Sequence, residues 1–450
     1  MVRVTDMTHG RPIRLILLFS LPLMLGSVFQ QLYTIVDTII IGRGVGMQAL
    51  ASIGAADWIN WLVLWGLQGF TQGFAILAAQ EFGAGAYDRL RRVLAMIVKL
   101  SCWFGIAVTI ISLLLVRPLL TLLHTDPAVF GGAQTYLYVQ FGGSLIIIAY
   151  NMAAAVLRCL GDSRTPLFAI IAASFANIAL DLLFVMGFGW GIFGASFATV
   201  LAQLIAFLLC LRSLRRLPFV QLTKADWKTD PAILLHLCRL GIPTGLQMSM
   251  ITLGGMVLQS VLNGFGVVFV AGYTAANKLY GILESASVAF GYAMTAYMGQ
   301  NRGARNAARI DAGIRAVLVL SAEFTAAIVT AMLLAGKPLL GLFLSTEEAG
   351  AADALAVAYQ YLMVLMAFLF ALFMLQAYRS SLQGLGEMTV PTLSGFAEML
   401  MRMGAALVLP AFIGQSGVFF AEGAAWVCAA ALNLVWYYMR IGKIKRDMLK

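Results

Sequence analysis

Twelve long apolar stretches constrain this chain more than any other feature of its sequence. A helix needs about 20 apolar residues to cross a bilayer, and each stretch is long enough to do so. They lie near residues 15–41, 49–77, 93–116, 133–157, 166–187, 191–212, 240–262, 268–298, 312–335, 355–383, 391–413 and 418–440. Only 11% of all residues are charged, whereas soluble domains carry about 25%. The sequence therefore predicts an all-α polytopic membrane protein with twelve transmembrane helices.

The basic residues favour one side of the predicted membrane. If the N-terminus is cytoplasmic, 25 of the 30 Lys and Arg residues fall on the cytoplasmic side, Arg379 among them. Cytoplasmic loops are enriched in Lys and Arg, so we expect a multi-pass protein of the bacterial inner (plasma) membrane with both termini in the cytoplasm. The first apolar stretch is longer than the core of a cleavable signal peptide. The net charge of +10 thus reflects topology, and no nucleic-acid partner is expected.

Cysteine and histidine do not indicate a cofactor or a metal cluster. The five cysteines lie in or beside apolar stretches without a CxxC pair, and the three histidines are far apart. This pattern indicates neither a disulfide framework nor a zinc site. No HExxH or GxSxG signature is present. We therefore expect no cofactor and no enzyme, although a membrane-embedded enzyme is retained as the least favoured class.

The second half of the sequence repeats the first. Gln80, Gly83 and Ala84 match Gln300, Gly303 and Ala304 at one constant offset in the numbering. Further matches are Arg117–Leu120 with Lys337–Leu340, Leu157–Gly161 with Leu382–Gly386, and Pro22 with Pro243. Each copy holds six predicted helices, an even number, so the two copies share one orientation. This predicts two lobes related by a pseudo-twofold axis along the membrane normal.

The predicted domains follow from the duplication. The N-lobe covers residues 1–212, a basic cytoplasmic connector covers 213–239, and the C-lobe covers 240–450. Such symmetry suits alternating access, in which two bundles expose a central cavity to one side at a time. The alternative is that the duplication only built a stable bundle. Polar residues concentrated inside the apolar stretches favour transport.

Two aspartates, Asp37 and Asp181, lie inside apolar stretches. A carboxylate at bilayer depth costs about 2.5–3.5 kcal/mol, so such residues usually line an ion or substrate path. At 1.5 Å per helical residue, Asp37, Asp181 and Thr199 lie about 9, 8 and 12 Å from the outer surface. Asn177 and Asp181 are spaced i, i+4 and share one helix face. The alternative is that each aspartate caps or pairs near a helix end.

A pair of aspartates with amide and hydroxyl oxygens nearby can serve a coupling ion. An apolar surrounding favours the protonated carboxyl, whereas a bound cation favours the carboxylate. The pair can therefore exchange H⁺, or hold Na⁺ through oxygen ligands from Asp37, Asn177 and Asp181. The residues alone leave the choice between H⁺ and Na⁺ open.

These residues belong to a set of motifs that resembles the multidrug and toxic compound extrusion (MATE) transporters, and in particular their DinF-like branch. This family lies within the larger group of multidrug, oligosaccharidyl-lipid and polysaccharide exporters. The motifs are Gln31–Tyr33 with Val36–Thr38 and Ile41–Gly42, Ala79–Gln80 with Gly83–Gly85, Gly161–Pro166, Asn177–Asp181, Gly194–Ala195 with Ala198–Thr199, Gly241–Pro243, and Gly299–Asn301 with Gly303–Ala304. Their order and spacing carry the resemblance across essentially the whole chain.

The resemblance implies a secondary active antiporter that exports organic, often cationic compounds against inward H⁺ or Na⁺. The cation site of the DinF-like branch is similar to Asp37, Asn177, Asp181 and Thr199 here, with Asn151 as a further member. The related NorM-like branch adds acids in the C-lobe. The corresponding stretches 246–254 and 367–376 contain no acid, so a C-lobe cation site of that type is not expected.

Further residues are candidates for a substrate cavity. They are Gln31, Tyr33, Trp61, Gln247, Met248 and Glu284. Trp61 belongs to a helical stripe with Trp58 and Trp65, which either anchors the helix at the membrane interface or stacks on flat or cationic compounds. Methionines such as Met248 either form an adaptable binding wall or only pack. Glu284 either faces the cavity or pairs with Lys278.

One C-lobe pair bears on the charge of the substrate. Glu398 and Arg402 are spaced i, i+4 in the orientation that favours an ion pair. Arg402 is also the second-copy counterpart of Asn177, at the offset that relates Leu157–Gly161 to its match. A structural pair is the preferred interpretation, whereas an Arg402 free in the cavity would favour an anionic substrate.

The nearest rival function is a flippase of lipid-linked precursors or polysaccharides, which would need a wide cationic cavity. The expected protein acts as a monomer in the bilayer on small organic substrates.

Overall fold

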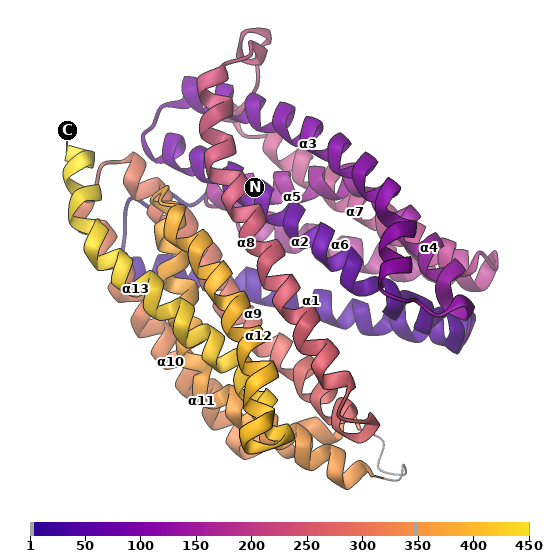
Figure 1. Cartoon of the computed structure of the whole chain (residues 1–450). Coiled ribbons are helices and arrows are strands. Elements are labelled where there is room, and N and C mark those ends of the chain that lie inside the picture. The colour runs from indigo at the N-terminus through magenta and orange to yellow at the C-terminus, as the bar shows by residue number, and fades with distance from the viewer. Residues whose placement is uncertain (1–3, 345–349, 450) are drawn as a thin grey trace. The chain divides into compact units, whose positions relative to one another are not determined.

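The computed structural model describes residues 4–344 and 350–449, and within these ranges the chain is helical without β-strands (Figure 1). The α-helices are α1 (Pro12–Gly44), α2 (Met47–Gly83), α3 (Tyr87–Leu122), α4 (Pro127–Gly142), α5 (Ser144–Cys159), α6 (Arg164–Asp181), α7 (Gly191–Arg215), α8 (Pro231–Asn263), α9 (Val267–Gly303), α10 (Ala307–Gly341), α11 (Ala351–Gly384), α12 (Thr389–Ile413) and α13 (Phe420–Leu449). The prediction of an all-α polytopic membrane protein is confirmed.

Ten of the described helical segments are individually long and apolar enough to cross a membrane, and the bent pair α4–α5 makes eleven. Helix α9 has 37 residues, as many as α2, but carries more polar residues. Counting α9 as a span gives the twelve helices predicted from the sequence.

The predicted helix 133–157 is two helices in the structure. Helices α4 and α5 meet at Gly143 with a bend of 50°. A Cβ atom at Gly143 would lie 2.5 Å from Val200 Cγ2 on α7, which is closer than packed atoms approach. The bend therefore brings backbone against a neighbouring helix at a position where only glycine fits.

Helix α6 changes its winding directly after Asp181. Residues Leu182–Gly187 form a π-helix, and the Phe188 N–H donates to the Leu183 carbonyl five residues back at 2.9 Å. Such turns are rare and often occur at functional sites. The prediction 166–187 covered this segment, but hydropathy alone does not reveal the change in winding.

Contacts divide the chain into two compact units. Unit 1 comprises Leu21–Ser249 with the start of the chain up to Asp6, and unit 2 comprises Met7–Ser20 with Met250–Lys450. Contacts thus assign the first turns of α1 to unit 2 and the first half of α8 to unit 1. The lobe boundaries at 212 and 240, which follow chain order and duplication, stay a prediction, as does the symmetry axis.

The duplication extends to helix lengths. Helices α1 and α8 have 33 residues each, and α2 and α9 have 37 each. Gly46 and Gly266, which are equivalent in the two copies, precede α2 and α9 with φ values of 108° and 90°. The repeat inferred from short motifs is therefore also a repeat of elements.

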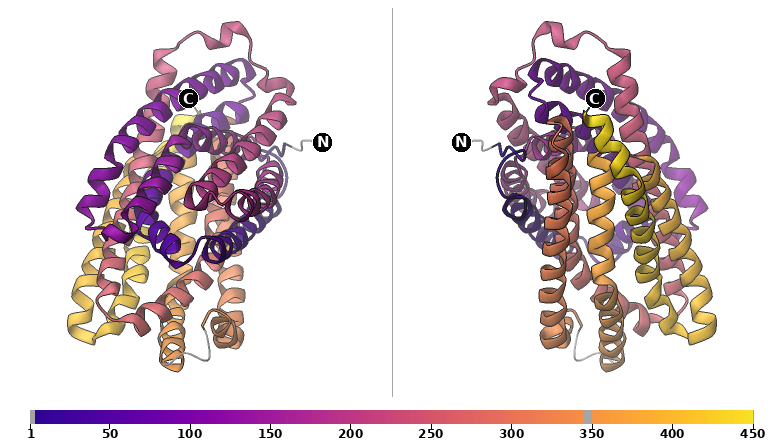
Figure 2. Two further views of the ribbon diagram at one scale, coloured as in Figure 1. Left: turned by 90° about the vertical axis from the view of Figure 1, so that its right-hand side faces the viewer. Right: turned by 90° about the vertical axis from the view of Figure 1, so that its left-hand side faces the viewer.

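Each unit is a helical bundle. In unit 1, α2 packs against α3, α4 and α5, and α7 packs against α5 and α6. In unit 2, α11 lies between α9 and α13, with α10 against α9 and α11 and with α12 against α13. Figure 2 shows these unit 2 helices running side by side.

Candidate cation and substrate site

Asp37 of α1 and Asp181 of α6 come together in unit 1. Their carboxyl groups lie within hydrogen-bonding reach of one another. Asp181 and Asn177 are 0% and 1% exposed, as expected for two residues on one buried helix face, while Asp37 is partly buried. The site therefore lies between α1 and the last α-helical turn of α6.

The site holds buried oxygen atoms without a donor. Among the described residues, none donates to Asp37 Oδ1, to either Asp181 carboxyl oxygen or to Asn177 Oδ1. An ionised carboxylate only accepts hydrogen bonds, so two carboxyl groups at this distance bond to each other only when one carries a proton. A small cation between them would satisfy the same oxygens. The donor set, two carboxylates and an amide oxygen, suits H⁺ or a hard cation such as Na⁺.

Aromatic and polar residues surround the pair. Tyr33 lies one turn before Asp37 on α1 and within electrostatic range of Asp181. Tyr136 of α4 lies within the same range of Asp37, and its hydroxyl accepts a hydrogen bond from Asn60 Nδ2 of α2 at 3.2 Å. Asn60 and Tyr136 were missed from the sequence because neither belongs to a recognisable motif. Asn60 could have been proposed as a site residue because it is a polar residue inside the second apolar stretch.

Thr199 and Asn151 bond to their own helices. The Thr199 hydroxyl donates to the Ala195 carbonyl of α7 at 3.2 Å, and Asn151 Nδ2 donates to the Ile147 carbonyl of α5 at 2.9 Å. Within the described residues, no hydrogen bond joins either side chain to the aspartates. Their participation in the cation site stays a prediction.

The substrate candidates of α1 and α2 differ in exposure. Gln31 is exposed and Tyr33 partly buried on α1. Trp61 is 44% exposed, and its ring meets that of Trp58 edge to face at a centroid distance of 5.2 Å. Exposure fits both the interfacial and the cavity interpretation of the tryptophan stripe.

Gln247 and Met248 lie on the part of α8 that belongs to unit 1. Gln247 is buried. A Cβ atom at Gly69 of α2 would lie 3.0 Å from Met248 Cγ and 2.7 Å from the Thr244 carbonyl oxygen. Met248 is therefore in close contact with α2, which favours the packing interpretation for this residue.

Glu284 of α9 lies among charged and aromatic residues of unit 2. It is within hydrogen-bonding reach of Tyr280 and close to Glu422 and Arg402. Among the described residues, no ion pair joins Glu284 to Lys278, and Lys278 is exposed. These surroundings do not support the pair with Lys278, and a position of Glu284 in a substrate cavity stays a prediction.

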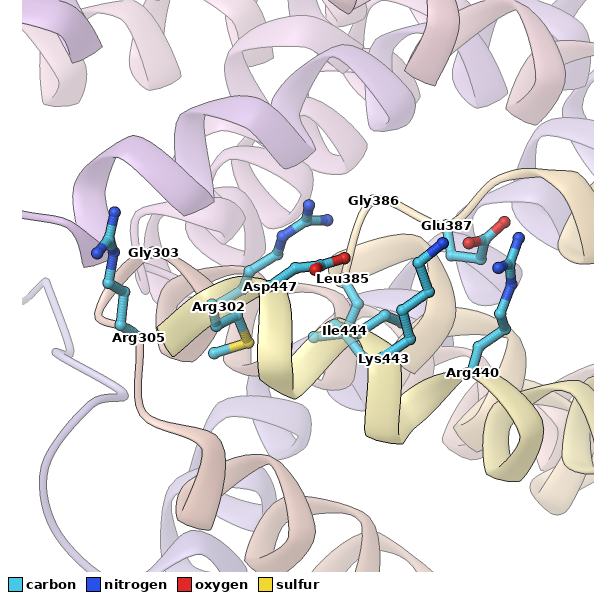
Figure 3. Close-up of a pocket in the computed structure, with 11 residues that line it drawn as sticks. Arg302, Gly303, Arg305, Leu385, Gly386, Glu387, Arg440, Lys443, Ile444 and Asp447 are labelled. Carbon is cyan, nitrogen blue, oxygen red and sulfur yellow. The ribbon is translucent and has the colours of Figure 1, made fainter. Parts of the chain in front are cut away.

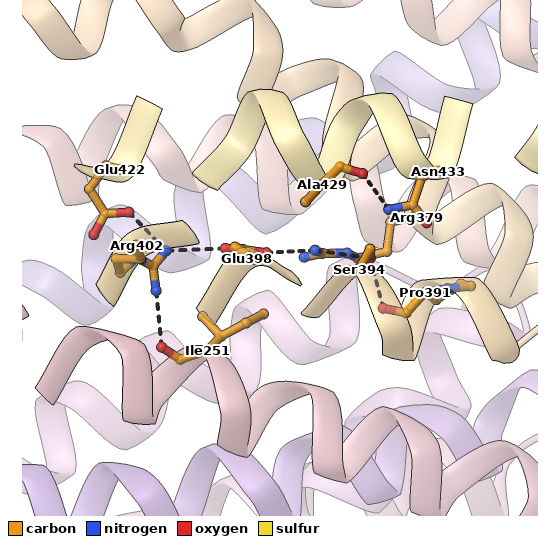
Figure 4. Close-up of polar contacts among 9 residues, drawn as sticks. All are labelled: Ile251, Arg379, Pro391, Ser394, Glu398, Arg402, Glu422, Ala429 and Asn433. Carbon is orange, nitrogen blue, oxygen red and sulfur yellow. Dashed lines mark hydrogen bonds and ion pairs between the residues drawn. The ribbon is translucent and has the colours of Figure 1, made fainter. Parts of the chain in front are cut away.

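A buried ionic network crosses unit 2 (Figure 4). Glu398 accepts from Arg379 at 2.6 Å and from Arg402 at 3.1 Å. Arg402 also pairs with Glu422 at 2.8 Å and donates to the Ile251 carbonyl at 3.0 Å. The predicted pair of Glu398 and Arg402 is confirmed, and the two terminal nitrogens of Arg402 are bonded, whereas its buried Nε has no partner among the described residues.

Two members of this network were not foreseen. Arg379 was assigned to the cytoplasmic side without a partner, and the structure shows it 4% exposed near the end of α11 and paired with Glu398. Its side of the membrane stays a prediction. Burial of one carboxylate between two guanidinium groups explains its position. The role of Glu422 was not predicted, although an acidic residue near the start of the last apolar stretch is unusual enough to indicate a buried partner.

Comparison with known proteins agrees with this architecture. The profile of the MatE family matches residues 22–183 and 243–408, one segment in each half of the duplication. The chain belongs to the MatE family.

Several known proteins match this chain over nearly its full length. A probable multidrug resistance protein, YpnP, of Bacillus subtilis is 32% identical over 99% of this chain and 98% of its own. The multidrug export protein MepA of Staphylococcus saprophyticus is 22% identical over 94% of this chain and 93% of its own. A crystal structure of a MATE protein in complex with MaL6 superposes with a TM-score of 0.91 at 24% identity, covering 99% of this chain and 100% of that one.

Proposed function

We propose that this MatE protein is a secondary active exporter of small organic compounds, coupled to inward movement of H⁺ or Na⁺ through Asp37 and Asp181. This proposal rests on the two carboxyl groups, which come from different helices and lie next to each other. Their buried oxygens accept no hydrogen bond from a donor among the described residues. The names of the relatives, multidrug resistance and multidrug export proteins, support organic compounds as the substrates.

The pair suits a carrier for one cation at a time. With a proton or Na⁺ between them, the carboxyl groups attract through the shared cation, and without it two negative charges repel. Binding and release of the cation thus change the preferred distance between α1 and α6. A transport cycle needs such a difference, because a ligand shifts a conformational equilibrium only when it interacts differently with the two states. One charge crossing 100 mV supplies about 2.3 kcal/mol, enough for a concentration ratio of about 50.

The paired state of Arg402 argues against the rival flippase. A cavity for anionic lipid-linked precursors needs unneutralised cations. Arg379 and Arg402 share Glu398, and Arg402 has Glu422 as a second partner. The network therefore offers little positive charge to an anionic substrate, and a neutral or cationic substrate is the better fit.

The test is efflux of a fluorescent cationic dye from proteoliposomes under separately imposed pH and Na⁺ gradients. We expect one of the two gradients to drive transport by the unmodified protein, and Asp37→Asn or Asp181→Asn to lower that rate at least tenfold. Asp88→Asn is the matched control, because Asp88 is an exposed aspartate of unit 1. Full gradient-driven transport by both site variants would refute the coupling role.

A further inference from the structure

A pocket in unit 2 lies where three helix ends meet (Figure 3). It has a volume of about 420 Å³ and is lined by the end of α9, the turn between α11 and α12, and the last turns of α13. Its charged residues are Arg302, Arg305, Arg440, Lys443, Glu387 and Asp447. None of them belongs to the cation site or to the network around Glu398. The predicted topology places the pocket at the cytoplasmic surface of the membrane.

The pocket carries more positive than negative charge. Four cations face two acids, which leaves a surplus of two positive charges. Arg302 lies within electrostatic range of Glu387 and Asp447, whereas among the described residues no carboxylate lies within ion-pair distance of Arg305 or Lys443. The Arg440 guanidinium rests over the Trp436 ring at 4.9 Å, which holds it at the pocket edge.

Arg305 adopts a backbone conformation that is costly for arginine. It follows α9 with φ of 55°, in a turn where the Asn306 N–H donates to the Asn301 carbonyl and the Arg305 N–H donates to the Arg302 carbonyl. This is the Schellman ending, whose left-handed position is usually glycine. The equivalent turn of the first copy, after α2, has Gly85 there, with φ of 68°. The second copy thus keeps an arginine at a strained position.

The first copy has no cation at the position of Arg302. The first-copy counterpart of Arg302 is Phe82, whose ring meets those of Phe219 and Tyr87 at centroid distances of 5.5 and 6.3 Å. The cations Arg302 and Arg305 are therefore specific to the second copy, since the first copy has Phe82 and Gly85 at the equivalent positions. Backbone strain that persists at one residue is commonly stored where that residue has a function.

From this charge surplus and the strained Arg305, we infer that the pocket binds a phosphate group, supplied either by the head group of an anionic lipid or by a soluble phosphate compound. Arginine forks match phosphate oxygens geometrically, and lysine adds a mobile charge. Basic pockets between transmembrane helices on the cytoplasmic side are known to bind anionic head groups. Glu387 and Asp447 also attract the arginines of the pocket, so a ligand must bind these arginines more strongly than the two carboxylates do.

The two sources are separated by titrating the purified full-length protein with phosphatidylglycerol, phosphatidylcholine or inorganic phosphate, while following its melting temperature and lipid retention by native mass spectrometry. Stabilisation by phosphatidylglycerol alone would assign a lipid head group, and stabilisation by phosphate would assign a soluble compound. Equal effects of phosphatidylglycerol and phosphatidylcholine, with none from phosphate, would overturn the inference.

Variants test whether the effect arises in this pocket. Arg305→Gln with Lys443→Gln is expected to weaken binding about fivefold for each cation removed, whereas Glu387→Gln with Asp447→Asn is expected to tighten it. Arg215→Gln with Arg216→Gln is the matched control, since both arginines are exposed and removing them changes the net charge equally. Unchanged binding in the first variant, or equal weakening in the control, would overturn the assignment.

Arg305→Gly separates binding from folding. Glycine relieves the strain of the left-handed position, so the ligand-free protein should melt at a higher temperature while its affinity for the phosphate ligand falls about fivefold. A purely structural role for Arg305 predicts that stability falls and affinity stays the same, which would contradict the proposal.

Discussion

The buried charged residues of this protein lie next to other charged residues. Asp37 and Asp181 face each other, and Glu398 lies between Arg379 and Arg402. The two groups differ in balance: the unit 2 network matches opposite charges, whereas the unit 1 pair joins like charges and leaves oxygens without donors among the described residues. An unbalanced site in a dry interior is the kind of site that exchanges a cation.

The balance around Glu398 gives a prediction for stability. Glu398→Gln would leave two buried guanidinium groups without their shared carboxylate, and removing one partner of a buried pair typically costs about 3–5 kcal/mol. A thermal-melting series in detergent should therefore show a large loss. Asp311→Asn, which breaks the more exposed pair with Lys445, should cost less than about 1 kcal/mol. Similar losses in both variants would mean that the network does not stabilise unit 2.

Some of these residues could be predicted from the sequence and others could not. Asp37, Asp181 and Asn177 were predicted to meet because a charge in an apolar stretch and an i, i+4 spacing can both be read directly. The pairing of Arg379 with Glu398 was not predicted, because the two residues are on different helices and their sequence separation follows no helical spacing. Tyr136 and Asn60 come from helices α4 and α2, and only the packing of those helices brings them to the site.

At the level of helices, close backbone approach positions the elements. Helices α2 and α8 pack through Gly73 and Gly241 of unit 1, where a Cβ atom at Gly73 would lie 2.6 Å from Gly241 Cα. The sequence marked Gly241 as part of a motif, but the contact itself depends on tertiary packing. The bend between α4 and α5 was missed for the same reason.

This contact predicts the effect of one methyl group. Gly73→Ala should force α2 away from α8 and lower stability by about 1–3 kcal/mol, as overpacking does. Gly54→Ala in the same helix is the control, because a Cβ there meets nothing within 4 Å and alanine is the better helix former by about 1 kcal/mol. The melting temperature should fall in the first variant and stay or rise in the second. The reverse order would contradict the described packing.

The connector after α7 is fixed by one aspartate outside the membrane. Burial raises the pKa of Asp226, but hydrogen bonds from the Thr223 N–H and hydroxyl, both at 2.7 Å, and the charge of Arg91 outweigh burial and lower that pKa. A lowered pKa contributes stability above the ordinary Asp value of about 3.9, and this contribution is lost as the pH falls through the native value.

Asp226→Asn should therefore destabilise the connector at neutral pH. Limited proteolysis between Leu217 and Pro231 is expected to be faster in the variant at pH 7, and the difference from the unmodified protein should shrink as the pH falls below about 4. A difference that is independent of pH would show that the Asp226 charge does not hold this segment.

At the scale of the whole molecule, duplication gives two units that have kept their helix lengths and changed their chemistry. The first copy has the carboxyl pair and an aromatic cluster around Phe82. The second copy has the balanced ionic network and the basic pocket. Motif offsets predicted the duplication because glycine and proline anchors are retained. The difference in charge between the two copies could be predicted only in part, from the absence of acidic residues in 246–254 and 367–376.

The central claim, that Asp37 and Asp181 exchange a cation during transport, is tested most directly by ion release from purified protein when substrate is added. In weakly buffered detergent solution, a transported dye should displace H⁺ or Na⁺ from the unmodified protein, detected by a pH indicator or a Na⁺-sensitive electrode. Asp181→Asn should bind the dye with little or no ion release. Equal release of the ion by the variant and the unmodified protein would contradict the account.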